Sequence, residues 1–429
     1  MQRLIGRITA GRPTLEGMSV SSAAPADPAP AHPATAERHR LGTPGLRRVN
    51  LALFAAGLST FMSLYCVQAL LPDMSRDFGV SPSRASLLVS LATGAVAVAV
   101  IPVSSLSERF GRTRVMLVSS VAATVVGLLL PLCPTFGALA AVRAVQGVAL
   151  AGVPAVAMAY LADEVDPGSL GGAMGRYIAG TSLGGLLGRV IPGTLTDAVG
   201  WRWAVAAVAL VVLASTVLFW ALLPPSRFFR PSRIEHRALL DHLANRDLRG
   251  LYLIALVLMA GMVTVYNFLT YRLLAAPFHL PQAVVGLISV MYVGGSIGSA
   301  RAGGLADRVG RRPVLLGALL MTAAGLALTL PPSLPLVGAG LLVFTVGFFA
   351  AHSVASGWVG ARATTARAQA SALYLCAYYL GSSVGGTAGG LAYEHSGWTG
   401  TGVYVLALVA VALVVTLDLN GRLLVKLRR

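Results

Sequence analysis

Long apolar stretches recur along nearly the whole chain and are separated by short polar or charged segments. Each stretch is long enough to cross a bilayer, which takes about 20 helical residues. Because every backbone polar group in lipid must find its partner within its own segment, such spans form helices. Twelve stretches are centred near Gly57, Gly94, Thr124, Val148, Gly184, Leu210, Met262, Gly294, Ala324, Phe344, Leu380 and Leu408. The pattern predicts an all-α polytopic membrane protein with twelve transmembrane helices.

Two separate matches indicate that the second half of the chain repeats the first. A charged segment at 104–113 returns about 200 positions later at 303–312. The matched residues are Leu106, Glu108, Arg109, Gly111 and Arg112, against Leu305, Asp307, Arg308, Gly310 and Arg311. A second set recurs at nearly the same offset, with Tyr177, Gly188, Gly193, Gly200 and Trp201 against Tyr374, Gly385, Gly390, Gly397 and Trp398. So long a period predicts two pseudo-symmetric six-helix bundles, an arrangement typical of transporters.

The composition between the spans suggests how the chain is divided. We expect residues 1–48, rich in Ala, Pro and Ser, to be a disordered tail, followed by a first bundle at 49–223. A basic connector at 224–249, a second bundle at 250–420 and a basic tail at 421–429 complete the expected organisation. Within the connector, apolar residues at helical spacing indicate a short helix, which either lies on an anionic inner leaflet or merely tethers the bundles.

The chain is 56% hydrophobic and only 11% charged, well below the charged fraction of soluble domains, which is about 25%. Its net charge of +17 does not indicate a nucleic-acid partner, because the basic residues crowd into the loops on one side. The opposite side carries Arg76, Arg84, Arg202 and, at its margin, Arg272. This asymmetry places both termini in the cytoplasm.

The type of basic residue suggests a bacterial source. Lys426 is the only lysine among the 33 basic residues, a bias typical of GC-rich bacterial genes, so we expect a multi-pass protein of a bacterial inner membrane. Cys66, Cys133 and Cys376 are too far apart to indicate a disulfide framework or a metal site. We expect no cofactor and a monomer.

Three motifs carry a resemblance to a known family. The loop at 303–312 resembles the signature loop between the second and third helices of the major facilitator superfamily, with Ser104 and Glu108 as departures in the first-half copy. Arg143 and Gln146, followed by Gly147, resemble the fourth-helix signature of the same superfamily. A glycine ladder in the fifth helix is similar to that of its proton antiporters, although the usual Gly-Pro is replaced. The ladder consists of Gly175, Gly184, Gly188 and Gly193.

The resemblance covers roughly residues 50–420 and implies a twelve-helix transporter, most like the bacterial sugar-efflux and drug-efflux permeases. It also implies that the charged loops act as a cytoplasmic gate that latches only when that side is shut. The gate residues would be Glu108, Arg109, Arg112, Asp307, Arg308 and Arg311. The alternative is a pair of tight basic hairpins that only set the topology.

Ionisable residues within spans point to function, because their burial is costly. Arg143 and Arg189 are expected near one level of the outer half of the membrane, where they would attract an anionic or polar substrate. Structural hydrogen bonding to helix carbonyls is the alternative for Arg143. No carboxylate falls in the middle of a span, so the coupling candidates are Asp73, as a partner of Arg143 or Arg189, and His352. A histidine that packs against a backbone carbonyl is the alternative for His352.

Two further features complete the predicted site. Gly180, Gly184 and Gly188 form a row of small residues that lets the fifth helix approach a neighbour closely. Tyr266, Asn267 and Tyr378 combine aromatic faces with polar groups, as in cavities for organic ligands, although helix core is an equal alternative.

These observations favour a secondary transporter over an enzyme, for which the spans provide no paired catalytic groups. We expect a small-molecule substrate and protons as partners. The first hypothesis for the function is proton-coupled efflux of a sugar, drug or metabolite. The second hypothesis is proton-coupled uptake, or uniport, of an anionic small molecule.

Overall fold

The computed structural model describes residues 38–229 and 236–419. The expected disorder of residues 1–37 and the expected basic tail at 421–429 lie outside these residues. The described residues belong to one compact unit, and the description below concerns that unit alone.

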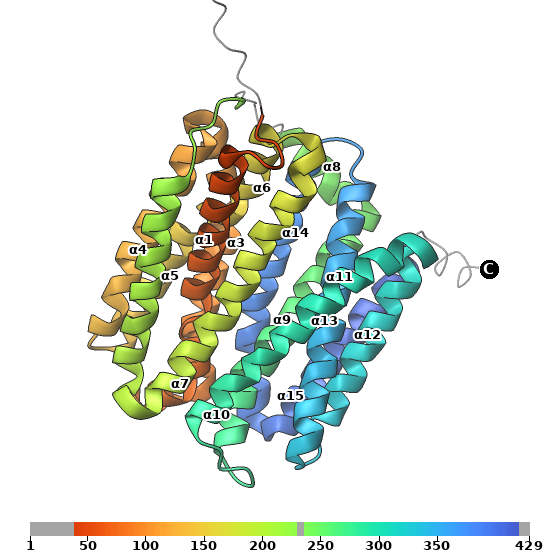
Figure 1. The fold of residues 1–429 in the computed structure, drawn as a ribbon. Helices are drawn as coiled ribbons and strands as arrows, with labels where there is room; N and C mark the ends of the chain where they lie inside the picture. The colour runs from red at the N-terminus through yellow and green to blue at the C-terminus, as the bar shows by residue number, and fades with distance from the viewer. Residues whose placement is uncertain (1–37, 230–235, 420–429) are drawn as a thin grey trace, which may run out of the picture. The chain divides into compact units, whose positions relative to one another are not determined.

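Helices make up both halves of the unit (Figure 1). The first half contains α1 (Pro44–Tyr65), η1 (Gln68–Leu70), α2 (Leu71–Phe78), α3 (Pro82–Phe110), α4 (Arg112–Leu129), η2 (Leu130–Leu132), α5 (Phe136–Leu150), α6 (Gly152–Glu164) and α7 (Pro167–Leu222). The connector contains α8 (His236–Ala244). The second half contains α9 (Arg246–Leu274), α10 (Gln282–Gly286), η3 (Leu287–Val290), α11 (Met291–Val309), α12 (Arg311–Leu328), α13 (Leu334–Arg362), α14 (Arg367–Leu380), η4 (Gly381–Gly385) and α15 (Gly386–Asp418).

The predicted twelve spans are present, although two pairs are joined without a loop. Ten continuous helical segments of the described residues are long and apolar enough to cross a membrane. One of them, α7, has a non-helical residue at Gly200, where φ is 77° and ψ is 160°. A similar break in α15 falls at Ser396 and Gly397. Each break separates two spans, which confirms the all-α fold of twelve membrane helices.

Two helices begin earlier than the expected bundle boundaries. Helix α1 starts at Pro44, inside the stretch expected to be tail, because the Thr43 hydroxyl accepts a hydrogen bond from the Leu46 N–H and Pro44 suits the first helical turn. Helix α9 starts at Arg246 rather than at 250, because the Asn245 side chain caps the N–H of Leu248. The expected short helix of the connector is present as α8.

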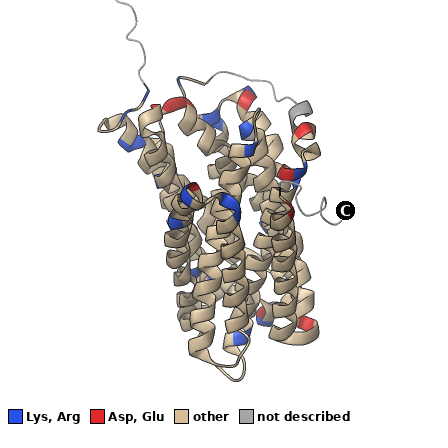
Figure 2. Ribbon diagram, turned by 90° about the vertical axis from the view of Figure 1, so that its right-hand side faces the viewer, with Lys and Arg blue, Asp and Glu red and all other residues tan. Residues whose placement is uncertain are grey.

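The two charged loops adopt the same backbone conformation, as a duplicated unit requires. Gly111 has φ 90° and ψ 144°, and Gly310 has φ 95° and ψ 150°. Only glycine adopts these angles without strain, because a side chain would collide with the neighbouring carbonyl group. Figure 2 shows Lys and Arg concentrated toward the upper part of the bundle. We call the end of the bundle that carries these two glycine turns the basic end.

The glycine row of the fifth span packs directly against α1. A side-chain carbon at Gly180, Gly184 or Gly188 would lie less than 3 Å from the backbone of Phe54, Leu58 or Met62, respectively. The two helices therefore touch through their backbones over about two turns. The same two helices provide one wall of the cavity described below.

The chain before α1 is held against the loop that joins α6 to α7. The N–H of His39 donates to the carbonyl of Glu164 at 2.9 Å, and the N–H of Asp166 donates to the carbonyl of His39 at 3.0 Å. Burial lowers the pKa of His39 below its ordinary value of 6.5, so the ring is uncharged at neutral pH. This contact ties the start of the first span to the fourth and fifth spans at the basic end.

Candidate functional site

A cavity of about 440 Å³ lies between the two halves of the bundle. The lining from the first half is Phe61, Tyr65, Pro154, Met158, Tyr177, Ile178, Thr181, Ser182, Gly185 and Arg189. The lining from the second half is Met259, Met262, Tyr292, Ser296, Ser299, Phe348, Phe349, His352, Ser353, Ser356, Ser371, Tyr374, Leu375, Tyr378 and Tyr379. This size falls in the range of ligand sites, about 300–1,000 Å³. Aromatic, serine and methionine side chains dominate, and Arg189 is the one Arg, Lys, Asp or Glu among the lining residues.

The cavity extends toward the basic end. Met158 and Ser356 lie within two turns of the ends of α6 and α13, and Ser371 lies in the first turns of α14. All three helix ends are on the basic side of the bundle. A solute would therefore enter or leave the cavity from that side in this conformation.

Hydrogen bonds join the two halves at the opposite end, which we call the sealed end. They connect Gln68 with Asn267, Ser75 with Tyr271, Ser83 with Glu394, Ala69 with Gln282, Asp197 with Ala283, and Ser90 with Thr387. Among the described residues, every hydrogen bond between the halves lies within three turns of this end. At the same end, a side-chain carbon on Gly193 would lie 2.7 Å from the Gly286 Cα, so α7 and α10 touch through their backbones.

Arg189 lies at the closed side of the cavity. Its side chain is held between the Tyr65 and Tyr292 rings, with the guanidinium carbon 4.0 and 4.6 Å from their centroids. The Nε–H donates to the Gln68 Oε1 at 2.5 Å, and Nη1 donates to the carbonyl of Gly185. Tyr65 and Gln68 belong to the first half and Tyr292 to the second, so both halves fix the position of this cation.

Gln68 links Arg189 to the second half. While its Oε1 accepts from Arg189, its Nε2 donates to the Asn267 Oδ1 at 2.6 Å. Gln68 and Asn267 are separated by 199 residues, the same offset as the two charged loops. Residues at the repeat offset meet where the pseudo-two-fold axis passes between the halves, as in a symmetric dimer. The sequence analysis singled out Asn267 but not Gln68, although a lone glutamine between apolar residues at the repeat offset from Asn267 was a usable signal.

A double-mutant cycle tests this link. Gln68→Leu and Asn267→Leu each leave a buried polar partner unsatisfied, at a cost of about 1–3 kcal/mol. We expect each variant to raise the labelling rate of a cysteine introduced at Ala69 roughly 5-fold or more. The double variant should be no more reactive than Gln68→Leu alone, because that substitution already removes the contact with Asn267. Additive effects would show that they act separately.

Arg143 does not line the cavity. Its guanidinium is fully buried and donates to the carbonyls of Leu88, Ser63 and Leu64 and to the Gln146 Oε1. This arrangement matches the structural alternative, in which the arginine satisfies helix carbonyls. Gln146 likewise faces Arg143 and not the cavity lining.

The other predicted site residues occupy different places. Tyr378 lines the cavity, whereas Tyr266 is buried behind it and shares a 2.9 Å hydrogen bond with the Thr345 hydroxyl. His352 lines the cavity, with its Nδ1 3.0 Å from the Tyr374 hydroxyl. Its partner is thus a tyrosine hydroxyl instead of the backbone carbonyl of a neighbouring helix.

Asp73 is placed differently from the expectation. Its Oδ1 accepts a hydrogen bond from Arg76, one turn further along α2, rather than from Arg143 or Arg189. Its Oδ2 is buried and has no hydrogen-bond partner among the described residues. Asp73 therefore lies at the sealed end, outside the cavity lining.

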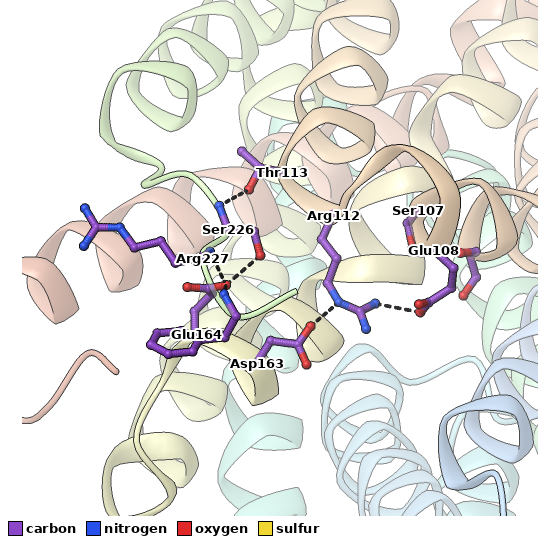
Figure 3. A network of polar contacts seen from close by, with 10 residues as sticks. Ser107, Glu108, Arg112, Thr113, Asp163, Glu164, Ser226 and Arg227 are labelled. Carbon is purple, nitrogen blue, oxygen red and sulfur yellow. Dashed lines mark hydrogen bonds and ion pairs between the residues drawn. The ribbon is translucent and has the colours of Figure 1, made fainter. Parts of the chain in front are cut away.

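The first charged loop takes part in a polar network at the basic end, shown in Figure 3. Arg112 pairs with Glu108 at 3.0 Å and with Asp163 of α6. Next to this pair, the Glu164 carboxylate accepts hydrogen bonds from the Ser226 hydroxyl and from the backbone N–H groups of Arg227 and Phe228, at 2.6–2.9 Å. The start of the connector is thereby bound to the first half.

The remaining gate residues make fewer contacts. Arg109 packs over the ring of Phe110 at 5.4 Å. Asp307, Arg308 and Arg311 form no hydrogen bond or ion pair with any residue that the structure describes. The ion pairs of Arg112 join residues of the first half, and this end of the bundle is the one toward which the cavity extends.

Comparisons with known proteins agree with this architecture. The family model of the Major Facilitator Superfamily matches residues 53–271 and 251–425. The chain is 43% identical to the inner membrane transport protein YnfM of Escherichia coli K12, covering 89% of this chain and 93% of that one. It is 41% identical to the uncharacterised MFS-type transporter YybF of Bacillus subtilis 168, over 90% and 95% of the two chains.

A solved structure has the same fold. It is a bacterial homolog of the human lysosomal transporter Spinster in an inward-facing and occupied conformation, with a TM-score of 0.71 and 15% identity. The alignment covers 88% of this chain and 97% of that chain. Together with the family match over both halves, these similarities show that the chain belongs to the Major Facilitator Superfamily.

Proposed function

We propose that this protein is a secondary transporter that moves a small solute by alternating access through the cavity around Arg189. The supporting observation is that one cavity is shared by both halves and extends toward one end, while all described hydrogen bonds between the halves lie at the other. Rocking the halves about the cavity would break the sealed-end contacts and close the basic end.

We further propose that the basic end faces the cytoplasm of a bacterial cell, as the distribution of arginine indicates. The conformation described here would then be inward-facing. Contacts of the charged loops between the halves would form only in the outward-facing state, which is consistent with the role proposed for Glu108, Arg112, Asp307 and Arg311 as a cytoplasmic gate. The remaining two gate residues, Arg109 and Arg308, would attract the anionic inner leaflet.

The direction we propose is proton-coupled efflux of a sugar, drug or metabolite. The close contact between α1 and the glycine row of α7 supports it, since a similar ladder marks the proton antiporters of the family. Two groups are candidates to carry the proton. Asp73 has a buried and unpartnered carboxylate oxygen at the sealed end, and His352 lines the cavity. Proton-coupled uptake, or uniport, is the second candidate, because an arginine in the cavity suits an anionic solute equally in either direction.

Flux measurements in inverted membrane vesicles test this proposal. We expect solute accumulation that depends on an imposed pH gradient and collapses when the gradient is dissipated, with sugars, organic acids and cationic drugs as the panel. Vesicles without the protein are the control. Flux that follows the solute gradient and does not depend on the pH gradient would indicate uniport and not antiport. No flux of any member of a broad panel would contradict the transport function itself.

A further inference from the structure

The cavity contains a buried positive charge for which the protein supplies no counter-charge. Arg189 is 2% exposed, yet no carboxylate of the described residues lies within ion-pair distance of it or lines the cavity. A buried charge without a partner is unfavourable unless another charge or several dipoles compensate it. Here the compensation consists of two hydrogen bonds and three aromatic rings.

The guanidinium group keeps an open side. Nε and Nη1 each donate one hydrogen bond within the protein, while Nη2 has no hydrogen-bond partner among the described residues. None of the Arg189 nitrogens belongs to the buried atoms that lack a partner, so the open side is not enclosed by protein. A carboxylate is the group whose two oxygens match the paired N–H groups of a guanidinium.

Arg143 provides a contrast within the same bundle. It is equally buried, but its Nε, Nη1 and Nη2 all donate hydrogen bonds, to three carbonyls and Gln146. Arg143 thus donates four of its five N–H groups within the protein, and it does not line the cavity. The difference between the two residues indicates that the incomplete hydrogen bonding of Arg189 is a property of a binding site.

We propose that the transported solute is a small organic anion with a flat, unsaturated body, whose carboxylate pairs with Arg189. This inference rests on the proposed transport function and narrows its substrate class. Beyond the arginine, the walls carry Phe61, Phe348 and Phe349, whose faces and edges suit a flat ring. The volume of about 440 Å³ is near the lower limit of ligand sites and suits a single-ring acid rather than a long lipid chain.

The other solute classes fit less well. A cationic drug would be repelled by Arg189. A sugar needs many free hydrogen-bonding groups, but three of the wall serines already donate to backbone carbonyls. The Ser296 hydroxyl donates to the carbonyl of Tyr292 at 3.0 Å, the Ser353 hydroxyl to that of Ser299 at 3.3 Å, and the Ser356 hydroxyl to that of Ser353 at 3.0 Å.

Binding to the purified full-length protein tests this inference separately from transport. The probes are benzoate, cinnamate and 4-hydroxybenzoate, with benzamide as the neutral isostere of benzoate and D-xylose as the sugar. We expect at least one of the acids to bind in equilibrium dialysis, and benzamide to bind roughly 10-fold to 100-fold more weakly than benzoate. Equal binding of benzamide and benzoate, or binding of D-xylose alone, would overturn the inference.

Variants identify the residue responsible. Arg189→Gln is expected to abolish the preference for the acid, and Arg189→Lys to retain part of it. Arg301→Gln, which removes one exposed charge from α11 outside the cavity, should bind like the unchanged protein. The comparison of benzoate with benzamide in the unchanged protein keeps the test decisive if Arg189→Gln does not fold. Flux of a neutral solute that is unchanged by Arg189→Gln would reject an anionic substrate but leave the proposed transport function standing. Binding of an acid without any measurable flux would support the anion site but contradict the transport function.

Discussion

Replacing Gly193 by leucine is expected to stop transport while leaving the protein folded. A side-chain carbon at this position would lie 2.7 Å from the Gly286 Cα, closer than such carbons approach in real structures. Because both partners are backbone atoms of different halves, the only relief is to separate α7 from α10 at the sealed end. The protein would then be held open at that end and could not complete its cycle.

Two measurements check this result. Flux should fall at least 10-fold, and a cysteine introduced at Ala69, which is 4% exposed, should react faster with a membrane-impermeant maleimide by a similar factor. Gly175→Leu on the same helix is the matched control, because nothing lies within 4 Å of the added carbon there. Normal flux in the Gly193→Leu protein would mean that the sealed end does not need this backbone contact.

Replacing Gly184 by valine is expected to prevent folding, whereas Gly193→Leu is expected to affect only the opening of the sealed end. The added carbon would lie less than 3 Å from the Leu58 backbone, and both helices belong to the same half. Overpacking against flexible side chains costs about 1–3 kcal/mol, and here the obstacle is a helix backbone that cannot move aside. Rigid-body motion of the halves cannot relieve this collision, so the first half itself must distort.

Size-exclusion chromatography and thermal unfolding of the purified protein measure this effect. We expect the Gly184→Val protein to aggregate or to be lost during extraction, while Gly175→Val behaves like the unchanged protein because its surroundings are open. A monodisperse Gly184→Val protein with unchanged thermal stability would show that α1 and α7 can separate without cost. The pair of glycine variants thus distinguishes contacts within a half from contacts between halves.

The fold was predictable because its determinants are periodic and repeated. Span length, arginine asymmetry and the two internal matches each depend on many residues, so single exceptions do not change the outcome. The loss of a loop at Gly200, and again at Gly397, leaves the count of twelve spans intact. Gly111 and Gly310 likewise share one backbone conformation although their loops differ at several positions.

The site was predictable only in part, because sequence spacing does not tell which carbonyl groups become free. Arg143 binds the carbonyls of Ser63 and Leu64 since α1 ends at Tyr65, and the last carbonyls of a helix lack partners within it. The break at the end of α1 is not visible in the apolar pattern. Asp73 similarly pairs with Arg76 one turn away, where a local partner is available at little entropic cost.

The contact between Glu394 and Ser83 has a further consequence. The Glu394 carboxylate, from one half, accepts a hydrogen bond at 2.9 Å from an N–H in the first turn of α3 in the other half. The N-terminal turn of α3 is thus capped in part by Glu394 of the other half, and this cap is lost when the sealed end opens. Water has to take over the exposed N–H and the released carboxylate, so this hydrogen bond between the halves is exchanged for hydrogen bonds to water each time the sealed end opens.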